Sequence, residues 1–380
     1  MGGILLVAHS GGPTAVINAS LLGVVEEARR YDAIGGVWGA RYGIDGILRR
    51  DFIDLSRQTD ATLQAVGRAP SSALGTSRRE VTHAELERLV GILRESGVRY
   101  FLYTGGNGSM GTAAQIAAVA AAMGYELAVV GIPKTIDNDL METHHTPGYA
   151  TTARFFACAL RDIGGDNRAL PGQVEFVEVL GRNAGWLVAA TALARHAPDD
   201  APHLIYFPEV CLPLDRLLCD IEDVYSRLGR CVVAVCEGQL DEHGEPFGAD
   251  VREGSRGKLA LNVAHRLSMI AAERLKLRTR SEKPGLLGRS GLAYPCKRDW
   301  EEARRCGRAA VRAVADRRSG VMVTLDAEGA TGLAPLEKVA FVERLMPAEW
   351  RNSAGNDVAP EFLSYARPLI GEVAAWRGLE

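Results

Sequence analysis

The sequence predicts an α/β protein with two domains, each built on a mostly parallel β-sheet. Short apolar runs of strand length alternate with segments of helical periodicity, which is the pattern of βαβ units. These runs fall into two sets, at roughly residues 1–150 and 170–250. The 380 residues are also enough to form two hydrophobic cores.

Each predicted strand ends in a turn or a helix. The predicted strands are ILLVA (4–8), RYFLYTGG (99–106), ELAVVG (126–131), QVEFVEVLG (173–181), HLIYFPE (203–209) and CVVAVCEG (231–238). Helical patterns are predicted at 14–29, 109–123, 185–195, 214–229 and about 257–276. Because open α/β sheets bind ligands at the carboxyl ends of their strands, the turns after these strands are the predicted ligand sites.

Composition excludes several classes of protein. The net charge of −3 argues against nucleic acid as a partner, and the Arg-rich stretch 304–308 beside Glu301 and Glu302 is expected to be a solvated helix face. No apolar stretch approaches the ~20 residues that span a bilayer. The seven cysteines are odd in number and form no CxxC pair, so we expect reduced thiols in a cytoplasmic protein, without zinc or a disulfide framework.

Two Gly-rich turns follow predicted strands and open helices: SGGPTAVIN (10–18) and TGGNGSM (104–110). Glycines let the backbone approach an anion closely, and a helix N-terminus presents free N–H groups to it. Neither turn is a Walker A loop or a GxGxxG fingerprint, so neither predicts a P-loop or a dinucleotide site. At adjacent strand ends, the two turns together predict a phosphate-binding rim.

A third turn, GIPKTIDNDL (131–140), gathers Lys134, Asp137 and Asp139 after an apolar strand. Taken alone it could be a polar corner, since Asp and Asn favour such turns. Beside a phosphate site it suits metal-assisted phosphoryl transfer, or divalent metal binding without transfer. The positive charge of Lys134 favours transfer.

These three turns, with HTPGYATTA (145–153) and VEVLGRNAGW (177–186), resemble the phosphofructokinase family, and the resemblance runs from about residue 3 to residue 372. The first Gly-rich turn and the tail are closer to its pyrophosphate-type branch. The resemblance implies two Rossmann-like α/β domains with the active site in the cleft between them. The expected parts are a phosphate-donor domain (1–150, joined by part of 285–340), a sugar-phosphate domain (151–284) and a C-terminal helical segment (341–380).

The resemblance also implies a role for each site residue. Asp137 is the expected general base, supported by Thr135 and Asp139, with Lys134 and Arg182 stabilising charge. The expected donor-binding residues are Gly11, Gly12, Arg78, Gly106, Asn107, Gly108 and Ser109; the substrate-binding residues are Leu180, Gly181, Arg182, Glu237, Arg280 and Arg289. The expected cofactor is Mg²⁺ at Asn107 and Asp137. Asn107 replaces a usual aspartate, which predicts weaker metal binding.

Gly108 and Lys134 give opposite indications of the phosphoryl donor. Gly108 leaves room for the rest of ATP, whereas Lys134 is typical of pyrophosphate enzymes. A long lysine can rotate aside, so Gly108 is weighted more and ATP is slightly favoured over pyrophosphate. Ile44, where an aromatic residue often covers the adenine, and Pro13 argue against ATP.

The expected reaction phosphorylates the 1-hydroxyl of fructose 6-phosphate to fructose 1,6-bisphosphate, a step of glycolysis, in a homodimer or homotetramer. Gln173 and Leu286 replace an arginine and a histidine of the ATP enzymes. They motivate an alternative acceptor: another sugar phosphate, a polyol or a nucleoside. A non-catalytic paralogue that binds phosphometabolites is a third hypothesis, motivated by Asn107.

Overall fold

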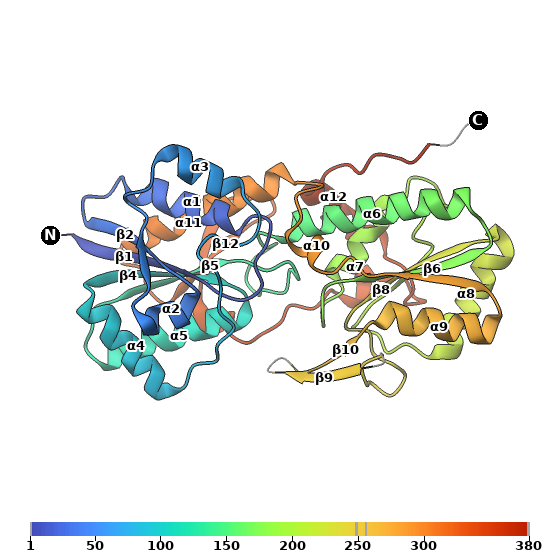
Figure 1. Cartoon of the computed structure of the whole chain (residues 1–380), viewed down its shortest axis with the longest axis horizontal. Coiled ribbons are helices and arrows are strands. Elements are labelled where there is room, and N and C mark those ends of the chain that lie inside the picture. The colour runs from blue at the N-terminus through green and yellow to red at the C-terminus, as the bar shows by residue number, and fades with distance from the viewer. Residues whose placement is uncertain (1, 248–249, 255–256, 378–380) are drawn as a thin grey trace. The chain divides into compact units, whose positions relative to one another are not determined.

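The computed structural model describes residues 2–247, 250–254 and 257–377, which form two compact α/β units (Figure 1). Unit 1 comprises the described residues up to 135 together with 139–149 and 297–344. Unit 2 comprises 136–138, 150–296 and the described residues from 345 onward. The stretch 341–380, expected as a segment of its own, is therefore divided between the units.

Unit 1 contains a seven-stranded sheet in the order β13-β12-β5-β4-β1-β2-β3. All neighbours pair in parallel except the two edge strands β3 and β13, which are antiparallel. The strands are β1 (Gly3–His9), β2 (Ile34–Ala40), β3 (Phe52–Asp54), β4 (Val98–Gly105), β5 (Ala128–Pro133), β12 (Val321–Leu325) and β13 (Thr331–Pro335). The central strands are apolar along their length because helices cover both faces of the sheet.

Helices α1, α3 and α11 pack against one face of this sheet, and α2, α4 and α5 pack against the other (Figure 1). The helices are α1 (Ile17–Ala28), α2 (Gly43–Arg49), α3 (Asp60–Arg68), α4 (His83–Glu95), α5 (Asn107–Ala122) and α11 (Lys297–Ala315), with a 3₁₀ turn at Leu336–Lys338. The start of α4 is fixed by a capping box between Thr82 and Glu85.

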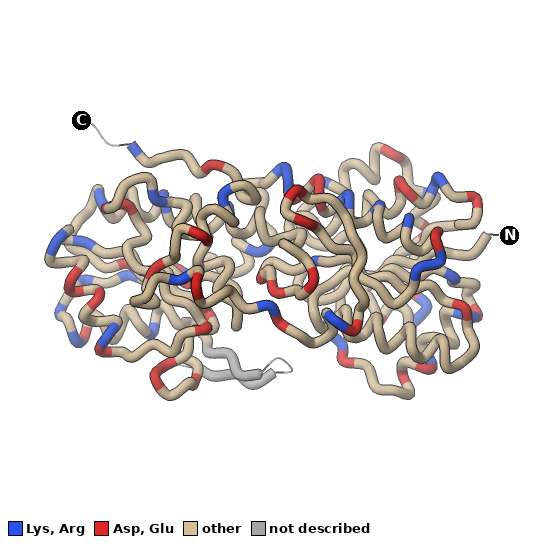
Figure 2. The backbone as a smooth tube through the Cα atoms, turned by 180° about the vertical axis from the view of Figure 1, so that it is seen from behind, with Lys and Arg blue, Asp and Glu red and all other residues tan. Residues whose placement is uncertain are grey.

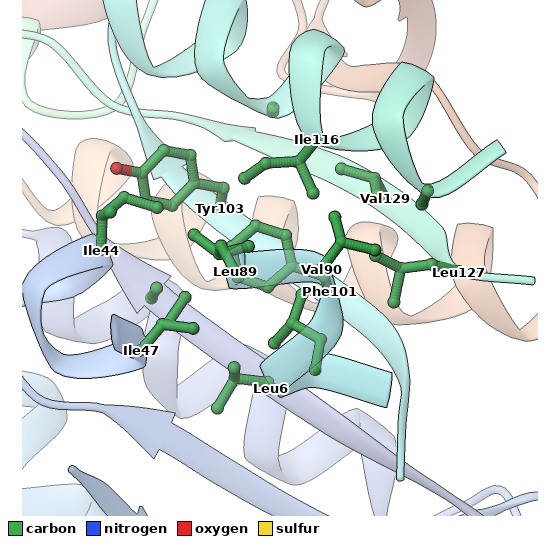
Figure 3. Packing of buried hydrophobic residues seen from close by; sticks show 14 of the residues in the cluster. Leu6, Ile44, Ile47, Leu89, Val90, Phe101, Tyr103, Ile116, Leu127 and Val129 are labelled. Atoms are coloured by element: carbon green, nitrogen blue, oxygen red, sulfur yellow. The ribbon is translucent and has the colours of Figure 1, made fainter. Parts of the chain in front are cut away.

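The core beneath α2, α4 and α5 is shown in Figure 3, where Ile44 packs with Ile47, Leu89 and Tyr103. Ile44 is fully buried. It therefore belongs to the packed interior and does not occupy a surface position over a nucleotide base, so it gives no information about the donor.

Unit 2 contains a four-stranded parallel sheet in the order β11-β6-β8-β7 and a separate antiparallel hairpin, β9-β10. The strands are β6 (Gln173–Val179), β7 (Leu204–Tyr206), β8 (Cys231–Cys236), β9 (Asp250–Gly254), β10 (Gly257–Leu261) and β11 (Arg278–Glu282). Strands β6 and β8 are buried at every position, as expected for the centre of a covered parallel sheet.

The helices of unit 2 include two that differ from the predicted bounds. They are α6 (Tyr149–Ala169), α7 (Trp186–Ala190), α8 (Leu214–Leu228), α9 (Val263–Leu275), α10 (Leu286–Ser290) and α12 (Pro360–Ile370), with 3₁₀ turns at Thr191–Ala194 and Ala348–Trp350. The helix predicted over 257–276 begins only at Val263, because 257–261 pair with β9. The helix predicted over 185–195 changes to a 3₁₀ turn after Ala190.

Basic and acidic residues are interspersed along both units (Figure 2). Among the described residues, no helix combines the length and the hydropathy needed to cross a membrane. The Arg-rich stretch of α11 is not a plain solvated face: Glu302 is 2 % exposed, and Arg304 and Arg308 both form ion pairs with Glu26 of α1.

Candidate active site

Three of the predicted turns meet at one edge of unit 1, after the neighbouring strands β5, β4 and β1. The Ser10 N–H donates to the Thr104 carbonyl at 2.9 Å, and the Lys134 N–H donates to the Gly105 carbonyl at 3.0 Å. The Gly11 N–H donates to the carbonyl of Ser77 at 3.0 Å, which adds the loop that carries Arg78. The structure thus brings the predicted donor-binding residues together in one unit.

Lys134 is held in place at this edge. Its side chain is almost entirely buried, with 3 % of the residue exposed, and its ammonium donates to the Gly12 carbonyl at 2.7 Å. Gly11 has φ +74°, and a Cβ there would lie 3.3 Å from the Lys134 Nζ. Glycine at this position therefore suits both the left-handed backbone and the space that the lysine occupies.

This finding corrects the premise on which ATP was favoured. A buried ammonium that donates a charge-assisted hydrogen bond cannot rotate aside without losing that bond. A Cβ at Gly108 would meet nothing within 4 Å, so the space beside Gly108 is open, as expected. Open space accommodates either donor, whereas a fixed lysine is a specific feature of the site.

Asn107 and Asp139 form a pair at the start of α5. The Asn107 Nδ2 donates to the Asp139 Oδ2 at 2.8 Å and to its carbonyl at 3.2 Å. Because the amide nitrogen must face the carboxylate, the amide oxygen faces away, and this Oδ1 is buried without a hydrogen-bond partner among the described residues. Such an oxygen fits a direct or water-mediated contact to Mg²⁺.

The described residues contain no group of three or more His, Cys, Asp or Glu side chains that could hold a metal ion. Mg²⁺ commonly uses one or two protein oxygens together with substrate phosphates. The buried amide oxygen of Asn107 in unit 1 therefore fits a metal that arrives with the donor, and it is not part of a permanent protein cage.

The remaining predicted donor-binding residues lie at the N-terminus of α5 and in the loop before α4. Gly106 is the N-cap of this 16-residue helix, and its carbonyl accepts the N–H of Ser109 at 2.9 Å. Arg78 is exposed and makes no ion pair within the described part of the chain. A helix N-terminus and an available guanidinium are both suited to phosphate.

His9 precedes these turns at the end of β1. Burial, together with the nearby charge of Lys134, lowers its pKa to about 3. Its Nδ1 lies 2.8 Å from the Ser72 hydroxyl, which in turn donates to the Gly75 carbonyl. The single hydroxyl proton is thus used, so the His9 Nδ1 carries the proton and the imidazole is neutral.

Asp137 does not group with the other residues of its turn. Residues 136–138 belong to unit 2, whereas Thr135 and Asp139 belong to unit 1. Asn138, with φ 57°, donates to the Tyr365 hydroxyl at 2.7 Å within unit 2. Burial raises the pKa of Cys236 at the end of β8. The Gly238 N–H lowers it, and the charges of Glu237, Glu209 and Asp137 raise it further.

The second predicted group lies in unit 2, after the neighbouring strands β6 and β8. The Gly181 N–H donates to the Glu237 Oε1 at 3.4 Å, and the Cys236 thiol donates to the Arg182 carbonyl at 3.4 Å. Arg182 has φ 49°, a strained value for a residue with a side chain. A Cβ on Gly238 would lie 1.7 Å from the Arg182 carbonyl oxygen, so only glycine permits this approach.

Glu237 is partly buried, and burial raises its pKa. The Glu178 carboxylate raises the pKa further, while the Gly181 N–H and the charges of Arg182 and Lys283 lower it. Lys283 also forms an ion pair with Glu178 at 2.7 Å. The end of this sheet therefore combines two carboxylates with two cations, a grouping of charges that is typical of functional sites.

The other predicted substrate-binding residues are dispersed. Leu180 directly follows β6 and is partly buried, and Arg289 is partly buried on α10. Arg280 on β11 is paired in register with Glu175, six residues before Gly181 and thus about 20 Å along the strand. Gln173 is fully buried and donates to Glu175 at 2.7 Å, whereas Leu286 is 65 % exposed.

Sequence reasoning missed a network on α11 that holds the segment after the turn 131–140. Glu302 lies 2.7 Å from the His145 Nε2, and Asp299 accepts the Gly148 N–H at 2.8 Å. The Thr146 hydroxyl donates to the Thr135 carbonyl at 2.9 Å. Burial raises the pKa of Glu302, but hydrogen bonds from His145 and Arg298 bring it below the usual value. Hydrophobic periodicity and residue composition do not reveal pairs of residues that lie so far apart in the sequence.

Comparison with known proteins identifies relatives that belong to the family the sequence motifs resemble. A family model described as "Phosphofructokinase" matches residues 4–314. A pyrophosphate–fructose 6-phosphate 1-phosphotransferase from Rhodospirillum rubrum is 39% identical over 382 residues, covering 97% of this chain and 94% of that protein. A protein of the same description from Xanthomonas campestris is 37% identical, covering 97% of this chain and 91% of that protein.

A solved structure gives the same result at the level of the fold. The crystal structure of a pyrophosphate-dependent phosphofructokinase from Nitrosospira multiformis superposes with a TM-score of 0.89 and 31% identity, covering 100% of this chain and 94% of that one. These relatives do not support the preference for ATP that Gly108 suggested. They agree with the pyrophosphate alternative.

Proposed function

Because the chain belongs to the phosphofructokinase family, we propose that it transfers a phosphoryl group from pyrophosphate to the 1-hydroxyl of fructose 6-phosphate. The observation that carries this choice of donor is Lys134, whose buried ammonium is bonded to the Gly12 carbonyl beside the first Gly-rich turn. The names of the similar proteins support the same donor and acceptor.

In the proposed mechanism, unit 1 binds the donor through the backbone N–H groups of its Gly-rich turns and through Arg78. Phosphoryl transfer passes through a loose transition state, so positioning and charge stabilisation supply most of the catalysis. Lys134 and Arg182 stabilise the charge of the transferring group. Asn107 and Asp137 would hold a Mg²⁺ ion that arrives with the donor, and the ion would neutralise charge on the phosphate oxygens. Asp137 accepts the proton of the sugar hydroxyl.

Arg280 supports the proposal that the enzyme is a homodimer or homotetramer. Within one chain it lies about 20 Å along the sheet from Gly181. A role for Arg280 in holding the sugar phosphate therefore requires the site of a second copy.

Paired turnover assays with pyrophosphate and with ATP, each with Mg²⁺ and fructose 6-phosphate, test the proposed function. We expect rapid turnover with pyrophosphate and little with ATP. A preference for ATP would overturn the proposed donor, and absence of turnover with either would leave the non-catalytic hypothesis.

A different acceptor is the second candidate, and Leu286 is the observation that favours it. An exposed leucine cannot donate a hydrogen bond to a sugar phosphate, as the histidine of the ATP enzymes would. Assays of other sugar phosphates, polyols and nucleosides with pyrophosphate distinguish the two. Turnover at least tenfold faster with another acceptor would replace fructose 6-phosphate.

A further inference from the structure

Glu209 is a buried carboxylate of unit 2 to which sequence reasoning assigned no role. It follows β7, the strand beside β8, and is reached through the turn after Tyr206. Its side chain is 5% exposed. A buried carboxylate without strong partners is costly, so its contacts indicate what it does.

One oxygen of this carboxylate accepts two backbone N–H groups. The Glu209 Oε1 accepts from Gly185 at 2.8 Å and from Met346 at 3.1 Å. Gly185 is the N-cap of α7 and closes the turn that begins at Gly181. A Cβ at Gly185 would lie 2.7 Å from the Glu209 Oε2, so a side chain there would push the Glu209 carboxylate aside.

The other oxygen faces a single cation at a longer distance. The Glu209 Oε2 lies 3.7 Å from the Arg351 Nη1, and neither atom has a hydrogen-bond partner among the described residues. Arg351 therefore balances the negative charge of Glu209 but does not fix the position of the carboxylate. The hydrogen bonds that Oε1 accepts from Gly185 and Met346 fix that position.

The turn held in this way contains Arg182 in its strained left-handed conformation, φ 49°. Two hydrogen bonds hold the first half of this turn: the Gly181 N–H donates to Glu237, and the Cys236 thiol donates to the Arg182 carbonyl. Its second half is fixed by Glu209 at Gly185. A strained residue persists only where surrounding contacts determine its conformation from both sides.

We propose that Glu209 is a positioning residue for Arg182, holding the turn 181–185 in the conformation that binds the sugar phosphate. The inference rests on the proposed function, because it takes Arg182 as one of the residues predicted to bind the sugar phosphate. It also predicts which substrate is affected: the acceptor in unit 2 and not the donor in unit 1.

The test compares Glu209→Ala with Arg351→Met. We expect Glu209→Ala to raise KM for fructose 6-phosphate about tenfold, since a buried N–H loses its acceptor, with KM for pyrophosphate unchanged. Arg351→Met removes the ion pair but keeps the acceptor oxygen, so its KM for fructose 6-phosphate should stay within about threefold of wild type. Its stability should fall, because the buried carboxylate loses its cation. Glu222→Gln, an exposed change on α8, is the surface control.

Amide hydrogen exchange on the ligand-free protein gives a readout that does not depend on turnover. In Glu209→Ala we expect faster exchange at Gly185, with β8 unchanged. Glu209→Gln, which keeps an acceptor oxygen, should lie between Ala and wild type, and it serves if the Ala variant fails to fold.

A wild-type KM for the acceptor in Glu209→Ala, or an equal rise in Arg351→Met, would overturn the positioning role. So would unchanged exchange at Gly185 in Glu209→Ala. Failure of the proposed function is a separate result, because it appears as lack of turnover in the wild-type enzyme while the exchange comparison still applies.

Discussion

At the scale of single residues, Lys134 and Asp137 lie three positions apart but have different surroundings. Lys134 is buried in unit 1 and bonded to the Gly12 carbonyl. Asp137 is half-buried and groups with unit 2. The turn between them contains Asn138 with φ 57°, which changes the direction of the chain at that point. This separation agrees with different roles, one toward the donor and one toward the acceptor hydroxyl.

Asp137→Asn should leave a folded protein with greatly reduced turnover. An amide cannot accept the hydroxyl proton, and general-base catalysis contributes about 10²–10⁴-fold. Steady-state kcat with pyrophosphate and fructose 6-phosphate measures the loss. Asp215→Asn, whose side chain is 85% exposed, is the control and should retain wild-type kcat. Near-normal turnover in Asp137→Asn would remove it as the base.

Lys134→Met should reduce kcat/KM for pyrophosphate by roughly 10–100-fold, because a charge-assisted hydrogen bond and a cation are lost at similar volume. Measurement with both donors separates a general defect from a change in selectivity. If Lys134 selects pyrophosphate, the ratio of ATP to pyrophosphate turnover should rise in the variant. An unchanged ratio would show that the lysine does not discriminate between donors.

At the scale of elements, helices α1 and α11 approach so closely that only glycine fits at their contact. A Cβ on Gly23 would lie 2.0 Å from the Arg304 carbonyl oxygen, and one on Gly307 would lie 2.0 Å from the Ser20 carbonyl oxygen. Ion pairs from Arg304 and Arg308 to Glu26 flank this contact. The two helices together cover one face of the unit 1 sheet (Figure 1).

Gly307→Ala should destabilise unit 1 by about 1–3 kcal/mol, because backbone atoms cannot yield to the added methyl group. Urea unfolding, followed by far-UV circular dichroism, measures the change. Gly91→Ala is the matched control: Gly91 is also in a helix, α4, but a Cβ there meets nothing within 4 Å. This control should gain up to about 1 kcal/mol from helix propensity. Equal effects of the two changes would contradict the close packing.

At the scale of the whole molecule, stability depends on pH through three histidines that the fold keeps neutral. Burial lowers the pKa of His9 to about 3, and burial with nearby positive charges lowers the pKa of His144 and of His203 to about 4. Below pH ~6.5 the unfolded chain binds protons at these residues before the folded chain does, so acidification favours unfolding. Burial raises the pKa of Glu175, Glu209 and Glu237, which acts in the opposite direction.

His9→Gln isolates one part of this dependence. Gln can still donate to Ser72 but does not titrate, so the variant should lose less stability than wild type between pH 7.5 and 5.5. The difference should be at most about 1.4 kcal/mol, the value of one pH unit below the unfolded pKa. His83→Gln, with a side chain 76% exposed, should keep the wild-type slope. Parallel slopes for wild type and His9→Gln would show that His9 is protonated normally in the fold.

Much of the fold could be predicted from local pattern. The six predicted strands correspond to β1, β4, β5, β6, β7 and β8, because buried parallel strands are continuous apolar runs bounded by turns. The helix predicted over 257–276 was wrong at its start, since 257–261 pair with β9 in a tertiary context. Strands β12 and β13 and helix α11 complete unit 1 from 297–344, far along the chain. The pairing of β12 with β5 joins residues far apart in the sequence, and local hydrophobic periodicity does not predict such pairing.

The sequence by itself determined the α/β class, the Gly-rich turns at strand ends and the motifs of the phosphofructokinase family. These features depend on the periodicity of apolar side chains, the backbone freedom of glycine and the spacing of residues within short motifs, all of which are local properties. Only the tertiary structure decided that Lys134 is fixed, that Ile44 is a core residue, that Asp137 groups with unit 2, and that Glu209 holds the turn of Arg182. Each of these depends on atoms brought together from distant positions, where packing and hydrogen-bond geometry, not residue type, select the partner.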